Sequence, residues 1–214
     1  TPTVYVSELF EKLLYGDQPA GWRIIGEKEN ILNFNREKIL DYYKNHYSTK
    51  NTVVCVAGDF NLNQTEEKVR KYFDKMQPVN HLHKIATMEE QSKPGVLLHY
   101  KKTDQTHFCL GVRAYDMFDK RKYALNLMAV MLGGNMSSRL FISIRERNSL
   151  AYYVHTSFEA TTDTGYLMTQ AGIKNDSLEK AVRLTLKEYQ DFKHNKVTAK
   201  ELKKAKDYVR GTTA

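Results

Sequence analysis

The sequence predicts an α+β fold in which an antiparallel-rich sheet is packed by helices. Segments with apolar residues at helical spacing and short β-branched runs are both present. They follow one another in blocks rather than in strict strand–helix alternation, which would favour a parallel sheet. The chain has 214 residues, 41% apolar and 27% charged, and this composition fits a globular protein with one large domain or two smaller ones.

The first part of the chain, residues 1–76, is predicted to be mostly helical. Its expected elements are a helix from Thr1 and Pro2 to Gly16, a helix over 35–47, a strand over 52–58 and a helix from about Leu62 with Asn61 before it. Apolar residues recur at helical spacing in each of the helices. The run TVVCVAG is short, apolar and β-branched, which is typical of a buried strand.

Residues 77–94 interrupt this pattern and separate the two parts of the chain. The stretch QPVNHLHKIATMEEQSKP contains two prolines, mixed charge and little periodicity. These features are typical of a linker between domains. The sequence therefore predicts a boundary here, with a second domain over 95–214.

The second part is predicted to contain the sheet. Strands are expected over 95–101, 106–114, 150–160 and 165–173, helices over about 120–132 and 138–145, and two final helices that begin near Asp176 and Thr198. Asp176 with Glu179, and Thr198 with Glu201, have the spacing of a capping box. The order of these strands and helices supports the α+β class.

A search for catalytic motifs finds no metal or nucleophile signature. None of the seven histidines belongs to an H-x-x-E-H or H-E-x-x-H pattern, and no G-x-S-x-G or Walker loop is present. His81 and His83 are a close pair, interpreted as solvated linker residues because no third ligand accompanies them. Gly133-Gly134-Asn135 is interpreted as a tight turn between helices rather than a phosphate site.

One pair of residues stands out in SSRLFISIRERNSLAYYV. Arg145 ends a predicted short helix and Tyr152 lies on the next strand. Arg offers five donors and Tyr one hydroxyl, and together they can hold a peptide carbonyl and stabilise an oxyanion. The alternative is structural, with Arg145 in a surface ion pair and Tyr152 in the core.

Charge and cysteine content restrict the partners and the compartment. The net charge is +8, but Lys and Arg alternate with Glu and Asp, as in KELKKAKDY, so we expect solvated helix faces and no nucleic-acid partner. There is no run of about 18 apolar residues, so no membrane partner is expected. Cys55 and Cys109 lie in apolar runs and are expected to be buried, reduced thiols, which suits a reducing compartment such as the cytoplasm.

Five stretches, in order, resemble the M16 (pitrilysin, insulinase and mitochondrial-processing peptidase) family of zinc metallopeptidases. They are VSELFEKLLYGDQPAGWRIIG, FNREKILDYYKNHYSTKNTVVCVAGDF, DQTHFCLGV, LGGNMSSRLFISIRERNSLAYYV and VTAKELKKAKDYVRG. The fourth resembles the family pattern G-G-x-x-S-S-R-L-F…R…L-x-Y-x-V. Together the five stretches cover essentially the whole chain.

The resemblance implies LuxS/metallopeptidase-like domains. Residues 1–76 would be the C-terminal part of a first M16 domain, and residues 95–214 a second M16 domain, incomplete at its C-terminus. The family places an Arg and a Tyr seven residues apart near the zinc, where they contact substrate, and Arg145 and Tyr152 match them. The family's H-x-x-E-H helix and third ligand would precede Thr1, so the resemblance assigns no zinc ligand to this chain and zinc only to the full-length parent.

Two functions follow from the resemblance. In the first, the chain is a fragment of an M16 zinc endopeptidase that hydrolyses peptides or unfolded polypeptides, and this part supplies substrate-binding and chamber-forming residues while being inactive alone. In the second, the parent is a non-catalytic M16 subunit or scaffold. The resemblance implies a homodimer, or a heterodimer with another M16 subunit, in either case. A basic nucleic-acid-binding module is the remote alternative.

Overall fold

The structure of the chain is a computed structural model that describes residues 1–79 and 83–213. The elements are α1 (Pro2–Tyr15), η1 (Pro19–Gly21), α2 (Lys28–Leu32), α3 (Arg36–His46), η2 (Thr49–Asn51), α4 (Leu62–Phe73), β1 (Thr106–Ala114), α5 (Lys122–Gly133), η3 (Phe141–Glu146), β2 (Ala151–Ala160), β3 (Gly165–Ile173), η4 (Asn175–Ser177), α6 (Leu178–His194) and α7 (Ala199–Thr213). The predicted α+β class is confirmed.

The described residues divide into two compact units. Thr1–Trp22 and Ala86–Ala214 form the first, which we call the sheet unit, and Arg23–Ile85 form the second, which we call the helical unit. Helix α1 thus belongs with the sheet in this structure. The assignment of 1–76 and 95–214 to two M16 domains, with a linker over 77–94, stays a prediction, and residues 80–82 of that linker lie outside the described part.

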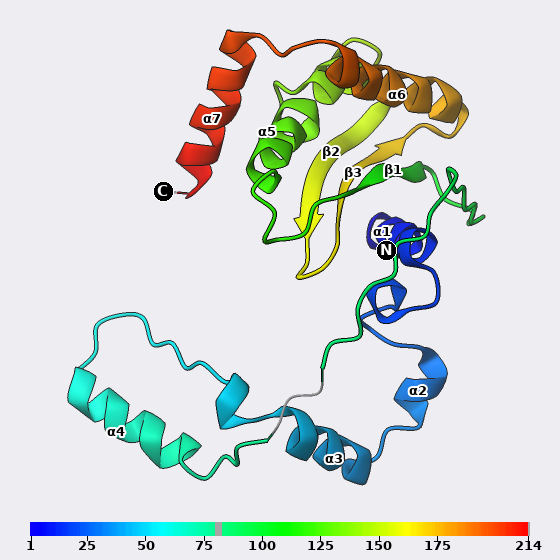
Figure 1. Cartoon of the computed structure of the whole chain (residues 1–214). Helices are drawn as coiled ribbons and strands as arrows, with labels where there is room; N and C mark the ends of the chain where they lie inside the picture. The colour runs from blue at the N-terminus through cyan, green and yellow to red at the C-terminus, as the bar shows by residue number, and fades with distance from the viewer. Residues whose placement is uncertain (80–82, 214) are drawn as a thin grey trace. The chain divides into compact units, whose positions relative to one another are not determined.

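The sheet unit is built on three antiparallel strands in the order β1-β3-β2 (Figure 1). Strand β1 pairs with β3 along its whole length, from Thr106 opposite Ile173 to Ala114 opposite Gly165. Strand β2 pairs with the other edge of β3 and ends with Ala160 opposite Gly165. The strands predicted over 106–114, 150–160 and 165–173 are therefore confirmed to within a residue.

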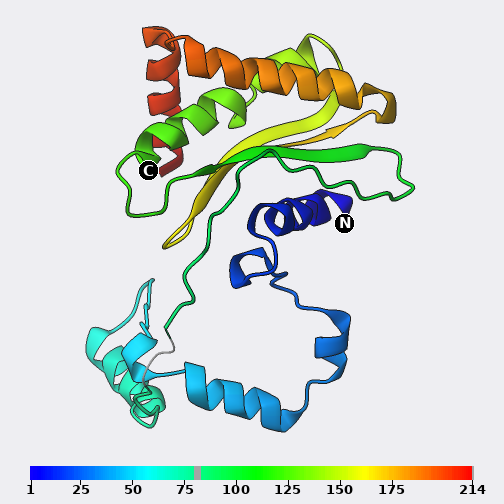
Figure 2. The same cartoon turned by 45° about the vertical axis from the view of Figure 1, so that its right-hand side comes forward.

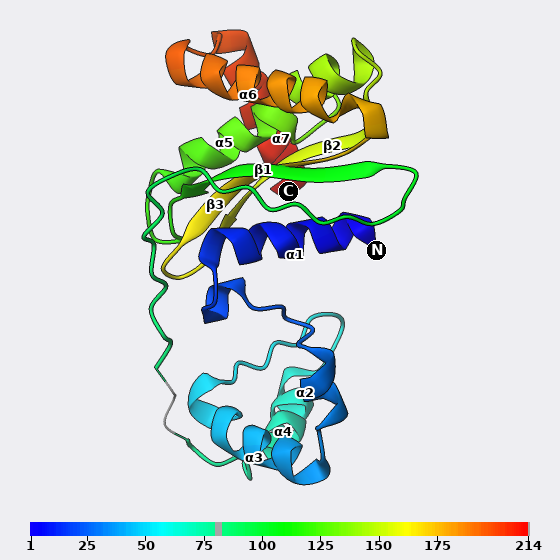
Figure 3. The ribbon, with the colours of Figure 1, turned by 90° about the vertical axis from the view of Figure 1, so that its right-hand side faces the viewer.

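Strand β3 is covered on both faces. Leu167, Ala171 and Ile173 are fully buried in the larger apolar core with residues of α5, η3 and α6. Tyr166 and Met168 point the other way, into a smaller core with α1. Figure 2 and Figure 3 show the resulting layers, with α1 on one face of the sheet and α5 and α6 on the other.

On the face of the sheet that α5 and α6 cover, the end of α5 closely approaches β2. A Cβ added at Gly133 would lie 2.3 Å from the Thr156 hydroxyl and 2.7 Å from the Thr156 backbone nitrogen. Thr156 in turn is hydrogen-bonded to Thr169 on β3, 2.7 Å away. The glycine therefore lets the end of the helix pack directly on the strand backbone, in addition to ending the helix as the sequence predicts.

Arg139, which lies just before η3, joins helices α6 and α7 of the sheet unit. Its guanidinium donates two hydrogen bonds to the Glu201 carboxylate at 2.7 and 2.9 Å and another to Asp191, and it lies 4.2 Å from the Phe192 ring. Glu201 begins α7 and Asp191 lies near the end of α6. The hydrogen bonds from Arg139 hold the pKa of Glu201 below its usual range, so this network is formed by a charged carboxylate and a charged guanidinium.

The helix starts of the chain are only partly as predicted. Asn35 and Asn61 accept hydrogen bonds from Lys38 and Gln64 and cap α3 and α4, and Thr198 caps α7 through the Glu201 backbone amide. The capping box expected at Asp176 is wrong, because a 3₁₀ turn over Asn175–Ser177 precedes α6.

Two predicted strands are corrected. Residues 52–58 and 95–101 are both without ladder pairing in the structure. In the first run Val53 is 93% exposed, and in the second Val96 is 82% exposed. The β-branched pattern was correctly seen, but a strand also needs a neighbouring strand to accept its hydrogen bonds.

The helical unit also lacks the buried apolar faces that the periodicity predicts. In α4, the apolar residues at helical spacing include Tyr72 and Phe73, which are exposed, and neither α3 nor α4 has a buried residue. Tyr43 and Tyr47 still share a face, with ring centroids 5.0 Å apart. Among the described residues of this unit, Ser48 is the only buried one.

We predict that Gly133→Ala lowers the free energy of unfolding by about 1–3 kcal/mol, because the added methyl group displaces the β2 backbone at Thr156. Gly211→Ala in α7 is the matched control: nothing lies within 4 Å of the place where its added methyl group would stand, and alanine favours helix. Denaturant unfolding of both variants measures the difference. Equal effects at the two positions would contradict the packing role of Gly133.

We predict that Arg139→Lys lowers the free energy of unfolding by about 1–3 kcal/mol at neutral pH, because lysine cannot make the bidentate bond to Glu201. The control is Arg183→Lys, which affects an exposed pair with Glu179 worth less than about 1 kcal/mol. The Glu201 pKa is lowered in the fold, so its stabilising contribution is present above the ordinary carboxyl range and is lost as the pH falls through the folded pKa. The cost of Arg139→Lys should therefore shrink at about pH 3. A cost that does not change with pH would contradict the ionic network.

Candidate functional site

The predicted pair, Arg145 and Tyr152, lies at either end of one short connection. Arg145 belongs to η3, and Tyr152 is the second residue of β2. Both side chains are exposed, Tyr152 by 55%. The connection between them departs three times from regular geometry, and each departure affects how one of the two side chains is presented.

The first departure is in η3, which is a π-helix rather than the expected α-helix. Its wider turn is marked by the hydrogen bond from the Arg147 amide to the Ile142 carbonyl, five residues back, at 2.9 Å. The Asn148 side chain donates to the Ser143 carbonyl at 2.8 Å and satisfies another acceptor of the same turn. Single π-turns occur often at functional sites.

The Arg145 side chain is available to a ligand. Its guanidinium lies 4.9 Å from the centre of the Phe141 ring, one turn earlier on η3. Among the described residues no carboxylate forms an ion pair with it. The surface ion pair that was the structural alternative for Arg145 is therefore not found in the described part of the chain.

The second departure is the backbone of Ser149, the one non-glycine residue with positive φ, 51°, among those described. The Ser149 amide donates to the Arg145 carbonyl at 3.1 Å and the Leu150 amide to the Ile144 carbonyl at 3.0 Å. These two bonds resemble a Schellman cap widened by one residue, with Ser149 in the left-handed position that glycine usually occupies. Ile144 and Leu150 are both buried and provide its apolar contact.

The third departure is a β-bulge at Tyr152. Ala151 is opposite Ile173 and Tyr153 is opposite Gly172, so Tyr152 is the extra residue of β2. Strict alternation, which would have placed Tyr152 and Tyr153 on opposite faces, does not hold at a bulge. Tyr152 is therefore unpaired in the ladder, and its side chain is exposed. The structural alternative, which placed Tyr152 in the core, is not what the structure shows.

Tyr153 anchors the strand next to this bulge. Its hydroxyl accepts a hydrogen bond from Gln170 Nε2 at 3.0 Å and lies 3.0 Å from His107 Nδ1. Gln170 Nε2 also donates to the Thr3 carbonyl of α1. The Tyr153 ring lies over Gly172, where a Cβ would come within 2.4 Å of a ring carbon. This network links all three strands and α1, and the sequence alone did not reveal it, because its members are far apart in the chain.

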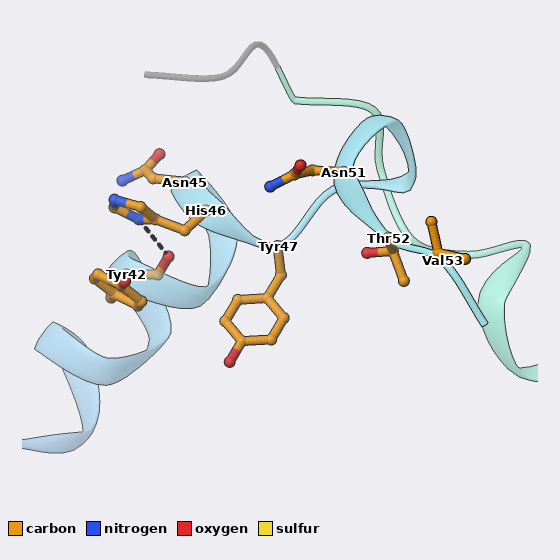
Figure 4. Close-up of a pocket in the computed structure, with 7 residues that line it drawn as sticks. All are labelled: Tyr42, Asn45, His46, Tyr47, Asn51, Thr52 and Val53. Atoms are coloured by element: carbon orange, nitrogen blue, oxygen red, sulfur yellow. Dashed lines mark hydrogen bonds between the residues drawn. The ribbon is translucent and has the colours of Figure 1, made fainter. Parts of the chain in front are cut away.

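A separate hollow lies in the helical unit (Figure 4). It measures about 480 Å³ and is open to solvent, and its lining comprises Tyr42, Asn45, His46, Tyr47, Asn51, Thr52 and Val53. The His46 ring stacks on Tyr42 at 3.9 Å, and His46 Nδ1 is 2.9 Å from the Tyr42 carbonyl. The one imidazole, His46, is the only potential general base in the lining, and no carboxylate or thiol accompanies it there as an orienting group or nucleophile.

Metal-binding and thiol chemistry have little support in the described residues. Within 1–79 and 83–213, no group of three His, Cys, Asp or Glu side chains is placed to hold a metal ion. The His81 and His83 pair lies partly outside this range. Cys109 is half-buried, and burial raises the pKa of its thiol to about 12, which keeps it unreactive. Cys55 is exposed, so the prediction that it is buried is wrong. None of the described helices is both long and apolar enough to cross a membrane.

Comparison with known proteins gives a family. The profile described as "Peptidase M16 inactive domain" matches residues 33–209. The Bacillus subtilis protein YmxG, described as an uncharacterized zinc protease, is 28% identical over 211 residues, which cover 99% of this chain and 51% of that protein. A Streptomyces coelicolor protein with the same description is 27% identical over 216 residues, covering 97% and 47%. The chain spans about half the length of the curated relatives it matches.

Solved structures show the same fold. A peptidase M16 inactive domain from Pseudomonas fluorescens superimposes with a TM-score of 0.85 at 22% identity, over 100% of this chain and 52% of that one. A protease from Helicobacter pylori gives 0.81 at 21% identity, over 98% and 52%. The chain belongs to the M16 peptidase family, and the resemblance seen in the sequence is confirmed.

We predict that His107 titrates below the ordinary histidine pKa of about 6.5, because burial lowers its pKa. The neutral ring can accept the Tyr153 hydroxyl proton at Nδ1, whereas the protonated ring cannot. Since the unfolded state then binds the proton more readily, this group reduces stability as the pH falls below about 6.5. Nuclear magnetic resonance titration of His107 checks the shift against the ordinary histidine value of about 6.5. A His107 pKa at or above that value would contradict it.

Proposed function

We propose that this chain is the substrate-binding part of an M16 zinc endopeptidase, in which Arg145 and Tyr152 hold a peptide carbonyl. The observation that carries the proposal is the exposed presentation of both side chains at the two ends of one irregular connection. The descriptions of the relatives as zinc proteases supply the reaction class. The zinc ligands would belong to the rest of the parent protein, as the family resemblance implies.

The chemistry assigned to the pair is binding and charge stabilisation. The Arg145 guanidinium offers several N–H donors and a fixed positive charge, and the Tyr152 hydroxyl offers one further donor. Two donors aimed at one carbonyl oxygen orient the scissile bond and stabilise the negative charge that develops there on attack. In a zinc peptidase the metal supplies the activated water for that attack. Neither Arg145 nor Tyr152 has to exchange a proton in this role.

The second candidate is a non-catalytic M16 subunit, in which the same pair serves the active site of a partner or a scaffold. The description of the matching family profile as an inactive domain is compatible with it. Both candidates use an M16 dimer, with an identical or a different partner subunit, and an extended peptide as the ligand. Reading the roughly 100 codons that precede Thr1 in the parent gene separates them, because only the first requires an H-x-x-E-H motif.

Binding of a fluorescein-labelled, unstructured peptide to the full chain tests the role of the pair. We predict that Arg145→Ala weakens binding about 10- to 100-fold, because a hydrogen bond to a charged group contributes about 1.5–3 kcal/mol. Tyr152→Phe should weaken it less, by about 3- to 10-fold, because it removes one neutral donor. Fluorescence anisotropy gives the affinities.

Matched controls for this experiment lie in the same unit. Arg147→Ala removes an exposed arginine two residues from Arg145, and Tyr123→Phe removes the hydroxyl of an exposed tyrosine on α5. Both should leave the affinity unchanged. If Arg145→Ala and Tyr152→Phe bind the peptide as tightly as the controls do, the proposed role is wrong. In the full-length parent, the same two variants should lower kcat more than they raise KM.

A further inference from the structure

We propose that Ser149 is a positioning residue, whose left-handed backbone sets the direction in which Tyr152 leaves the connection relative to Arg145. This inference rests on the proposed function of the pair. It begins from the positive φ of Ser149, which a non-glycine residue adopts at a cost of about 1–2 kcal/mol. Such a conformation persists where the surrounding structure requires it, and it is common at functional sites.

The surrounding contacts show why the conformation is needed. On the helix side, Ile144 is fully buried in the main core, which holds the end of η3 by packing. On the strand side, the Leu150 carbonyl accepts a hydrogen bond from the Lys174 amide at 3.2 Å, and Ala151 is already paired with Ile173. Four residues separate the last residue of η3 from the first of β2. The chain has to change from helix to strand within them, and the left-handed residue ends the helical turn.

The same cap lies in the chain directly between the two functional residues and is bonded to the backbone of one of them. The Ser149 amide is bonded to the carbonyl of Arg145 itself, at 3.1 Å. Three residues later, the bulge places Tyr152 outside the ladder while Tyr153 is held by Gln170 and His107. Tyr152 is thus bracketed between the cap on one side and the anchored Tyr153 on the other. A change of φ at Ser149 would break its bond to the Arg145 carbonyl and change the direction in which the chain enters β2.

The serine side chain is not needed for this role. No hydrogen bond from the Ser149 hydroxyl is found among the described residues, and the residue is exposed. Its contribution is therefore the backbone conformation, which glycine would adopt without steric cost. A β-branched residue is strongly disfavoured at positive φ. Glycine should accordingly preserve the arrangement, and a β-branched residue should disturb it.

The test compares Ser149→Gly and Ser149→Val in the full chain, with Ser92→Val in an exposed loop as the control. We expect Ser149→Gly to bind the fluorescein-labelled peptide as tightly as the wild type. Ser149→Val should bind about 10-fold more weakly, and amide exchange at Leu150 should become faster as the cap opens. If Ser149→Val does not fold, Ser149→Ala takes its place, because alanine carries the same penalty in smaller measure.

A double-mutant cycle separates positioning from a merely structural effect. The binding loss caused by Ser149→Val should largely disappear when Tyr152 is already Phe. A loss of equal size in both backgrounds would show that Ser149 does not act through Tyr152, and unchanged binding by Ser149→Val with faster exchange would show a structural role only. Either result overturns the proposal.

A spectroscopic measurement keeps this inference separate from the proposed function. In protein labelled with 3-fluorotyrosine, the ¹⁹F signal of Tyr152, assigned by its loss in Tyr152→Phe, should shift in Ser149→Val while that of Tyr123 stays fixed. If Tyr152→Phe has no effect on peptide binding, the proposed function fails, and this shift still decides whether Ser149 positions Tyr152. An unshifted Tyr152 signal would overturn the inference whatever the binding data show.

Discussion

Strand β3 is the constraint on which the sheet unit depends. It is hydrogen-bonded on both edges and buried on both faces, with Leu167 and Ala171 in one core and Tyr166 and Met168 in the other. Because side chains alternate along a strand, a slip of one residue would exchange the contents of the two cores. The registers of β1 and β2 are therefore fixed by β3, and the helices are placed by the side chains that β3 presents to them.

The irregular connection before β2 is a consequence of this fixed register. From Tyr153 onward β2 follows β3 residue for residue, while Leu140 and Ile144 hold η3 in the core. The segment between these two packed elements has to accommodate any mismatch between the end of η3 and the register of β2. It does so through a widened helical turn, one left-handed residue and one extra strand residue, each of which interrupts a regular hydrogen-bond pattern without leaving the buried Leu150 amide unpaired. The two exposed candidate residues, Arg145 and Tyr152, lie in this irregular segment.

Local pattern was sufficient to predict the three strands that pair in the sheet and several of the helices. The strands that form the sheet and the helices α3, α4 and α7 were found from apolar spacing and from their caps, because those signals come from neighbouring residues. Residues 52–58 and 95–101 carry the same strand signal, and Val53 and Val96 are nevertheless almost fully exposed. A local pattern indicates that a segment can form a strand. Whether it pairs with another strand depends on residues distant in sequence.

The same distinction applies to the site. The spacing of Arg145 and Tyr152 is a local feature and was recognised from it. The bulge at Tyr152, the positive φ of Ser149 and the Tyr153 network with Gln170 and His107 are set by cross-strand register and by the position of α1. A sequence that reads Asn-Ser between a helix and a strand is compatible with a left-handed cap, but it does not require one.

The comparison of Arg139 with Arg145 shows that residue type alone does not determine function. They lie six residues apart in one segment and each has a phenylalanine ring beneath its guanidinium, Phe192 at 4.2 Å and Phe141 at 4.9 Å. Arg139 is in addition surrounded by Glu201, Asp191 and Glu188, and its side chain is only 22% exposed, so its donors are already used within the fold. Arg145 has the ring without the carboxylates. An arginine held in place by an aromatic ring, while its charge stays uncompensated and exposed, retains both its orientation and its capacity to bind a polar ligand. That difference in partners, rather than the presence of arginine in the segment, is the physical basis for the structural role of Arg139 and for the binding role that we propose for Arg145.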